Sequence, residues 1–164
     1  MRVLRCFEAH YTGYIVMEYE LGQSLSSILK RRERSRERLT KAEIRAFLPP
    51  LLEGLQALHE AGFLHQDIKP DNLYLRDKNH TPVLLYFGAA RYALGSLLGR
   101  TTIANPGYAP FEQYQKGHQG PWTDIYALGA VLYRVIGGTC PPEVLERIDT
   151  IKRRYQSDPL MHAI

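Results

Sequence analysis

The sequence has few of the features that mark secreted, membrane-spanning or disulfide-rich proteins. Only 2 of its 164 residues are cysteine. Cys6 and Cys140 have no metal-ligand spacing, so we expect two free thiols in a reducing compartment. No apolar run approaches the roughly 20 residues that a membrane helix needs, and the start, "MRVLRCFEAH", has no signal-peptide core. The sequence contains no internal repeat and no low-complexity linker. We therefore expect a cytoplasmic globular protein with no membrane segment.

The composition is that of an ordinary folded domain. Hydrophobic residues make up 45% of the chain and charged residues 23%, as is usual for globular proteins. A domain of this size buries about 68–70% of the surface that its unfolded chain exposes. The chain can therefore build a real core, as one domain or as part of a larger one.

The net charge of +4 comes from a single segment. "KRRERSRER", residues 30–38, holds six basic and two acidic residues, and the remaining 15 basic and 15 acidic residues cancel. A patch for nucleic acid or an anionic membrane is one interpretation. The segment lacks interleaved aromatic residues, and Glu33 and Glu37 can pair with arginines along a helix. We favour a solvated helix end or loop and expect no nucleic-acid partner.

The first part of the chain predicts short strands and one short helix. "RVLRCFEAHYTGYIVMEYE" predicts two strands around a turn at residues 10–13, with residues 14–17 in the second strand. A short helix is expected to start near residues 23–25. Further along, residues 73–75 and 83–85 predict a small hairpin around "RDKNHTP".

A long amphipathic helix is predicted after residue 40. Thr40 and Glu43 have the spacing of a capping box. A helical stripe of apolar residues follows, and Gly62 is the expected stop. The stripe consists of Ile44, Phe47, Leu48, Leu51, Leu55 and Leu58. Pro49 and Pro50 lie inside it, and because an interior proline costs about 3 kcal/mol, a kink or break is expected there.

The second half predicts a long loop and two further helices. Residues 86–121 show little periodicity, and loops longer than about 12–15 residues in compact domains are usually functional. "TDIYALGAVLYRVIGG" is apolar on most sides and predicts a central, buried helix. One more amphipathic helix is expected after Pro141 and Pro142.

The segment "HQDIKPDN", residues 65–72, has the composition of a loop that transfers phosphoryl groups. Asp67 could accept a proton from a hydroxyl group, Lys69 could neutralise charge on the moving phosphoryl group, and Asn72 could hold a metal ion. The alternative is a surface turn with solvated charges. Eight such residues between a capped helix and a hairpin favour the chemical interpretation.

With these residues the chain resembles the protein kinase family, in its bacterial-type serine/threonine branch. "HQDIKPDN" resembles the catalytic loop, and "YAPFEQY" resembles the segment that closes the activation loop. "WTDIYALGAVLYRVIGG" resembles the central helix of the family. The resemblance implies structural roles for His65 in the catalytic loop and for Asp124, which would brace the backbone of that loop.

The resemblance also implies a nucleotide site that takes ATP and Mg²⁺. "YIVMEYELGQSL" resembles the hinge between the two lobes of a kinase. Met17 would be the gatekeeper, and the backbone of Glu18 and Glu20 would face the adenine. Tyr74 would lie under the adenine ring, and Ser24 would lie near the ribose.

One motif departs from the family at its metal site. The Asp-Phe-Gly motif of kinases is here Tyr86-Phe87-Gly88. A phenol has a pKa of about 10 and stays neutral, so Tyr86 cannot replace a carboxylate that bridges magnesium to phosphates. Asn72 is then left as a weak magnesium ligand.

Other parts that kinases use are not found within these residues. A Gly-rich phosphate loop, a strand lysine and a helix glutamate precede the hinge in the family, and the 164 residues contain none of the three. We expect an α+β, protein-kinase-like fold with an incomplete N-lobe. Residues 1–20 would supply the last N-lobe strands and the hinge, and residues 21–164 an incomplete helical C-lobe.

Milder departures concern the activation segment. Gln66 replaces an arginine that often contacts a phosphorylated activation loop, and Asn105 stands where a threonine usually contacts the catalytic aspartate. Thr101 and Thr102 are candidate phosphorylation sites or exposed hydroxyls without a role. Glu112 resembles a glutamate that pairs with an arginine in later helices of the family.

Three interpretations of function remain open. The chain could transfer phosphoryl groups from ATP to protein serine or threonine, with Asp67 as the base. It could be a pseudokinase that binds a partner, or a kinase remnant without activity. Losing one preorganised electrostatic contact typically lowers a rate by about 10²–10³, so we expect this chain to be inactive or severely impaired. An exposed lobe interface would suit a protein partner.

Overall fold

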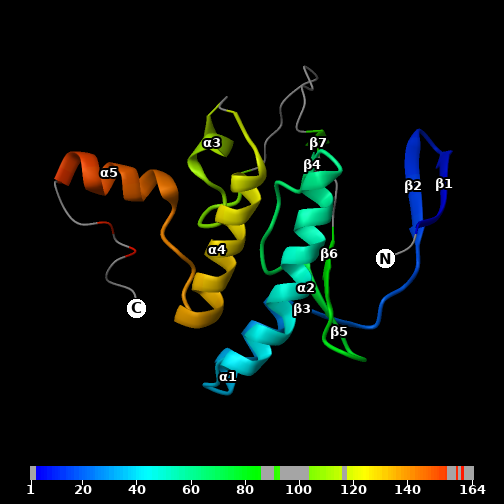
Figure 1. The fold of residues 1–164 in the computed structure, drawn as a ribbon, viewed down its shortest axis with the longest axis horizontal. Coiled ribbons are helices and arrows are strands. Elements are labelled where there is room, and N and C mark those ends of the chain that lie inside the picture. The colour runs from blue at the N-terminus through cyan, green and yellow to red at the C-terminus, as the bar shows by residue number, and fades with distance from the viewer. Residues whose placement is uncertain are drawn as a thin grey trace.

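The computed structural model describes residues 3–85, 91–92, 104–115, 118–154, 158 and 160. Within these residues, helices and three small antiparallel sheets form an α+β fold, as predicted. Figure 1 shows two long helices side by side in the middle of the molecule, with a separate strand pair near the N-terminus. No helix in the described part of the chain has the length and apolarity to cross a bilayer.

The predicted strand pair at the N-terminus is present. β1 (Val3–Ala9) and β2 (Thr12–Met17) pair in antiparallel fashion. The turn is shorter than the predicted residues 10–13, because Thr12 already pairs with Ala9. His10 and Tyr11 have φ values of 51° and 57°, and two left-handed residues make a tight turn whose twist fits the strands.

The two helices that follow begin where the sequence predicts. α1 (Leu25–Arg34) is capped by Ser24, whose Oγ accepts from the backbone N–H of Ser27 at 3.2 Å. α2 (Lys41–Glu60) opens with the predicted capping box. Thr40 and Glu43 there satisfy one another's backbone N–H groups, at 2.7 and 3.2 Å.

The predicted break at Pro49 and Pro50 is wrong, because α2 continues through both prolines. A proline at these positions removes the hydrogen bonds to the carbonyl groups of Arg45 and Ala46. All four residues lie on the exposed side of the helix, so water can bond the freed carbonyls. The predicted stripe faces inward: Phe47, Leu51 and Leu55 are buried, and Ile44, Leu48 and Leu58 pack against the core.

The core lies mainly between α2 and α4 (Pro121–Gly137), which stand side by side in Figure 1. α4 contributes four apolar side chains to it: Ala127, Leu128, Val131 and Val135. The prediction of a central, buried helix is wrong for one face of α4. Trp122, Ile125 and Ile136 are 57%, 49% and 58% exposed. The predicted last helix is α5 (Val144–Arg154).

Short strands hold the segment between the two central helices. The predicted hairpin is β5 (Leu73–Arg76) and β6 (Pro82–Leu84), and β3 (Gly22–Ser24) joins it as a third strand. Gly22 has no side chain, and a Cβ at this position would overlap the carbonyl oxygen of Leu75. The close approach of β3 to β5 therefore requires glycine.

Two further elements lie in or beside the region predicted as a loop. β4 (Phe63–Leu64) pairs with β7 (Arg91–Tyr92), and α3 (Phe111–Tyr114) is one turn of helix. The prediction of a long loop over residues 86–121 is therefore wrong at β7 and α3. Residues 65–72 connect β4 to β5, so short strands fix both ends of the candidate loop.

Candidate functional site: the loop at residues 65–72

The carboxylate of Asp124, on α4, anchors the start of the loop. Asp124 is fully buried, and its two oxygens accept from the backbone N–H groups of His65 at 2.9 Å and Gln66 at 2.8 Å. His59 Nε2 lies 2.8 Å from Asp124 Oδ2. This geometry suits the bracing role predicted for Asp124, because bonds to backbone groups hold the path of a chain directly.

His65 is buried, and its hydrogen bonds define its tautomer. Its Nε2 lies 3.2 Å from the carbonyl oxygen of Leu85, which can only accept, so Nε2 carries the proton. Nδ1 accepts from the backbone N–H of Asp67 at 3.3 Å. Burial lowers the pKa of His65, against the opposing effects of the Asp124 carboxylate and the Leu85 carbonyl. Both ring nitrogens have hydrogen-bond partners, which suits the structural role predicted for His65.

Asp67 lies at the centre of a closed polar network. Asn72 Nδ2 donates to Asp67 Oδ2 at 2.7 Å and to its backbone oxygen at 2.8 Å. Lys69 Nζ lies 3.1 Å from Asp67 Oδ1. The three residues of the loop predicted to be catalytic are therefore together, with side chains oriented by one another.

Asn105 completes this network from another part of the chain. Its Nδ2 donates to Asp67 Oδ1 at 2.5 Å, and its Oδ1 accepts from Lys69 Nζ at 3.0 Å. A threonine hydroxyl can donate once and accept, and a side-chain amide offers the same two functions. Asparagine can thus make both contacts where the family usually has threonine.

Gln66 holds the loop without a charged group. Its backbone has φ of 63°, a conformation that is rare outside glycine. Gln113 Nε2 donates to the backbone carbonyl oxygen of Gln66 at 2.8 Å. The side chain of Gln66 donates through Nε2 to Gln119 Oε1 at 2.7 Å. The side chain that replaces the family's arginine is therefore tied to the segment before α4.

The predicted nucleotide-binding residues lie along the exit from β2 and on the neighbouring sheet. Met17 ends β2 and is 43% exposed, and Glu18 follows it. The carboxylate of Glu20 forms a two-pronged pair with Arg76, at 2.8 and 2.7 Å. This bond to Arg76, more than any other influence, lowers the pKa of Glu20. The ion pair fixes the predicted hinge segment against β5.

Tyr74 and Ser24 have contacts that the sequence did not predict. The Tyr74 hydroxyl donates to the carbonyl oxygens of Gly22 at 2.6 Å and Glu20 at 3.3 Å. One of these acceptors, the carbonyl oxygen of Glu20, belongs to the backbone that was predicted to face the adenine. The Ser24 hydroxyl caps α1 and also lies 2.9 Å from the hydroxyl of Ser27.

Within the segment "APFE", Glu112 contacts α4. Its Oε1 accepts from the Thr123 hydroxyl at 3.0 Å, which ties α3 to the start of the central helix. The remaining predicted residues of the activation segment lie outside the described residues. They are Tyr86, Phe87, Gly88, Thr101 and Thr102.

The donor set around Asp67 does not fit a magnesium site. Magnesium is held through carboxylates and phosphates in near-ideal octahedral geometry. Both oxygens of Asp67 already accept hydrogen bonds, and Asn72 offers only a neutral amide oxygen. Among the described residues, no group of three or more histidine, cysteine, aspartate or glutamate side chains could hold a metal ion.

Sequence reasoning missed four residues that position the site: His59, Arg76, Gln113 and Gln119. Each acts through a contact across 47 to 65 positions of the chain. Local spacing gives no signal for such pairs. A polar side chain next to a predicted apolar face, as with His59 beside Leu58, is the one available hint.

Comparison with known proteins agrees with this architecture. The protein kinase domain family matches residues 1–161. A serine/threonine-protein kinase PknA from Nostoc sp. is 34% identical over 84% of this chain and 25% of its own length. An inactive serine/threonine-protein kinase PLK5 from Mus musculus is 32% identical over 85% of this chain and 24% of its own length.

A solved structure shares the fold as well. The chain described as "PpkA-294 apo form" has a TM-score of 0.74 and 37% identity, over 95% of this chain and 56% of that one. The chain belongs to the protein kinase domain family. It spans about a quarter of the length of the curated relatives named above. Members of this family generally use ATP and a metal ion.

Proposed function

We propose that this chain is a serine/threonine protein-kinase-like domain whose catalytic loop is assembled but whose phosphoryl transfer is severely impaired. One observation carries the proposal. The Asp67 network is complete, while the residue before Phe87-Gly88 is Tyr86 where the family has a metal-binding aspartate.

The residues of the loop define what chemistry is left. ATP would supply the phosphoryl group. Asp67 could accept the proton of a serine or threonine hydroxyl as that oxygen attacks phosphorus, and Lys69 could offset negative charge beside it. In the family a magnesium ion offsets the negative charge of the nucleotide phosphates, and the aspartate carboxylate helps to hold that ion. Without the carboxylate, binding of ATP with Mg²⁺ is expected to be weak.

A pseudokinase that binds a protein partner is the second candidate, and one exposed surface favours it. Every residue of β2 is exposed, including Ile15 at 63% and Val16 at 42%. Apolar strand surfaces of this kind are usually covered by protein. The 32% identity to a relative named as inactive also supports it. A remnant without selected activity is a third outcome. No nucleic-acid partner is proposed.

A cytoplasmic location is proposed on the chemistry of the thiols. Cys6 and Cys140 are both free and exposed. Free thiols persist in reducing compartments and are rare where disulfides form.

The proposal is tested by a melt and a transfer assay on the purified 164-residue chain. With millimolar ATP and Mg²⁺ we expect no shift in the melting temperature. Transfer to a serine/threonine peptide mixture should not exceed that of the Asp67→Asn variant. A Tyr86→Asp variant should bind nucleotide more tightly when Mg²⁺ is present, because it restores the carboxylate. Ligand at 100 times its dissociation constant adds about 2.7 kcal/mol of stability, which a melt resolves.

The outcomes separate the candidates. Transfer by the unmodified chain above the Asp67→Asn background contradicts the impairment. A shift with ATP but no transfer favours the pseudokinase. Aggregation without a cooperative melt favours the remnant.

A further inference from the structure

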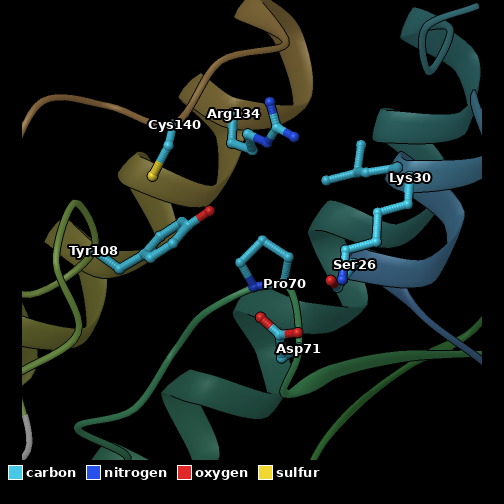
Figure 2. A pocket seen from close by; sticks show the side chains of 8 residues that line it. Ser26, Lys30, Pro70, Asp71, Tyr108, Arg134 and Cys140 are labelled. Carbon is cyan, nitrogen blue, oxygen red and sulfur yellow. The ribbon is translucent and has the colours of Figure 1, made fainter. Parts of the chain in front are cut away.

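An open groove of about 360 Å³ lies beside the catalytic loop, between α1, the loop and the end of α4 (Figure 2). Its lining is mostly polar. It consists of Ser26, Leu29, Lys30, Pro70, Asp71, Tyr108, Arg134 and Cys140. None of the interpretations drawn from the sequence assigns a role to this groove.

The groove continues from the catalytic site. Asp71 lies on the same loop as Asp67, four positions further along. Tyr108 lines both the groove and a small cavity that Asp67 and Asn105 also line. A chain segment that brings a hydroxyl group to Asp67 would therefore extend along this groove.

The two cations of the groove differ in what they contact. Arg134 is engaged, because its guanidinium donates to the carbonyl oxygen of Gly138 and pairs with Glu33. Lys30 extends from α1, and Figure 2 shows its nitrogen on the Ser26 side of the groove. Within the described residues it has no ion-pair or hydrogen-bond partner. Lys30 is thus the uncompensated positive charge of the groove.

The surroundings of Lys30 reinforce this charge. Residues 30–38 carry the whole net charge of +4, and they form the last turns of α1 and the turn that follows. Arg32 is neutralised by Glu37 and Glu43, but Arg34 and Arg36 are exposed. The α1 side of the groove is therefore positive. The floor carries the carboxylate of Asp71, which is negative.

We propose that the groove binds a polypeptide segment with acidic side chains toward α1, and that Lys30 is the residue that selects them. The inference rests on the proposed function, because the segment is the one that carries the acceptor hydroxyl. Asp71 repels an acidic side chain next to that hydroxyl. The selected acidic residues therefore lie several positions away from the serine or threonine, at the α1 end.

The test measures binding and needs no nucleotide. Two fluorescent 12-residue peptides with a central serine are compared by anisotropy with the full chain at low salt. One has glutamates near both ends, and the other has lysines at the same positions. The glutamate peptide should bind more tightly, and 0.5 M NaCl should weaken it, because salt screens exposed charges.

Three variants assign the effect to the groove. Lys30→Glu should weaken binding of the glutamate peptide by about 3- to 10-fold, since reversal replaces an attraction by a repulsion. Asp71→Asn should strengthen it. Arg36→Glu is the control, because it changes the net charge by the same amount at a residue that does not line the groove. It should weaken binding of the glutamate peptide less, by under about twofold at 0.15 M salt.

Several results would overturn the proposal. Equal binding of the two peptides, absence of binding to either, or equal effects of Lys30→Glu and Arg36→Glu would each do so. A 12-nucleotide RNA that binds as tightly as the glutamate peptide, and that depends on Lys30, would also overturn it, because it would indicate a general anion site. Selective peptide binding by a chain that transfers no phosphoryl group supports the groove and leaves the catalytic proposal to its own test.

Discussion

Asn105 Nδ2 lies 2.5 Å from Asp67 Oδ1, and the oxygen of the same amide accepts from Lys69 at 3.0 Å. The two residues are 38 positions apart in the chain. One neutral side chain thus orients both the candidate base and the candidate charge-neutralising group. It does so without the hydroxyl group that the family usually places there.

Replacing Asn105 by threonine should preserve this network, and replacing it by valine should not. Threonine and valine have nearly the same shape, but only threonine can donate and accept. We expect Asn105→Val to lower the free energy of unfolding by about 1–3 kcal/mol, since it leaves part-buried polar groups unpaired. Urea unfolding of the two variants measures the difference. Equal midpoints for both would contradict the role of the amide.

Removing the buried carboxylate of Asp124 should destabilise the chain strongly. Asp124→Ala leaves the N–H groups of His65 and Gln66 without their acceptor. Each unsatisfied buried group costs about 1–3 kcal/mol, so a loss of about 2–5 kcal/mol is expected by urea denaturation. Asp77→Ala, at an exposed turn, is the control and should change little. Similar losses for both variants would exclude the bracing role.

The stability of the chain should fall on acidification because of His65. Burial lowers the pKa of His65 in the folded state below its ordinary value of 6.5. Below about pH 6.5 the unfolded chain therefore binds a proton that the folded chain does not, and the free energy of unfolding decreases as pH falls. Urea midpoints at several pH values measure this slope.

Variants assign this slope to one residue. His65→Gln cannot take up a proton and should flatten the pH dependence below about 6.5. His10→Asn is the control, because His10 is an exposed turn residue, and it should keep the slope. A His65→Gln variant with an unchanged slope would show that other groups are responsible.

The two faces of α2 should respond differently to the same truncation. Leu55 is 1% exposed and Leu52 is 42% exposed on the same helix. Leu55→Ala should cost about 2–5 kcal/mol because it leaves a cavity in the core. Leu52→Ala should cost far less. Equal losses, measured by thermal or urea unfolding, would place the core elsewhere.

Most local elements could be predicted because their signals are local. The capping box at Thr40 and Glu43, the stripe through Phe47 and Leu51, and the N-terminal strand pair all lie within windows of a few residues. Pro49 and Pro50 mislead, since the cost of an interior proline depends on whether the freed carbonyl groups reach water. The exposure of Trp122 on α4 could not be predicted either, because it depends on which elements pack beside that helix.

The sequence by itself determined the family, through the order of four motifs, and it predicted that Tyr86 replaces a metal-binding carboxylate. It also located Asp67, Lys69 and Asn72 within one loop. Only the tertiary structure decided that Asn105 joins them, that Arg76 holds Glu20, and that Lys30 and Asp71 line the same groove. Such contacts join distant positions, and they form only when burial of the α2 and α4 faces brings the chain segments together.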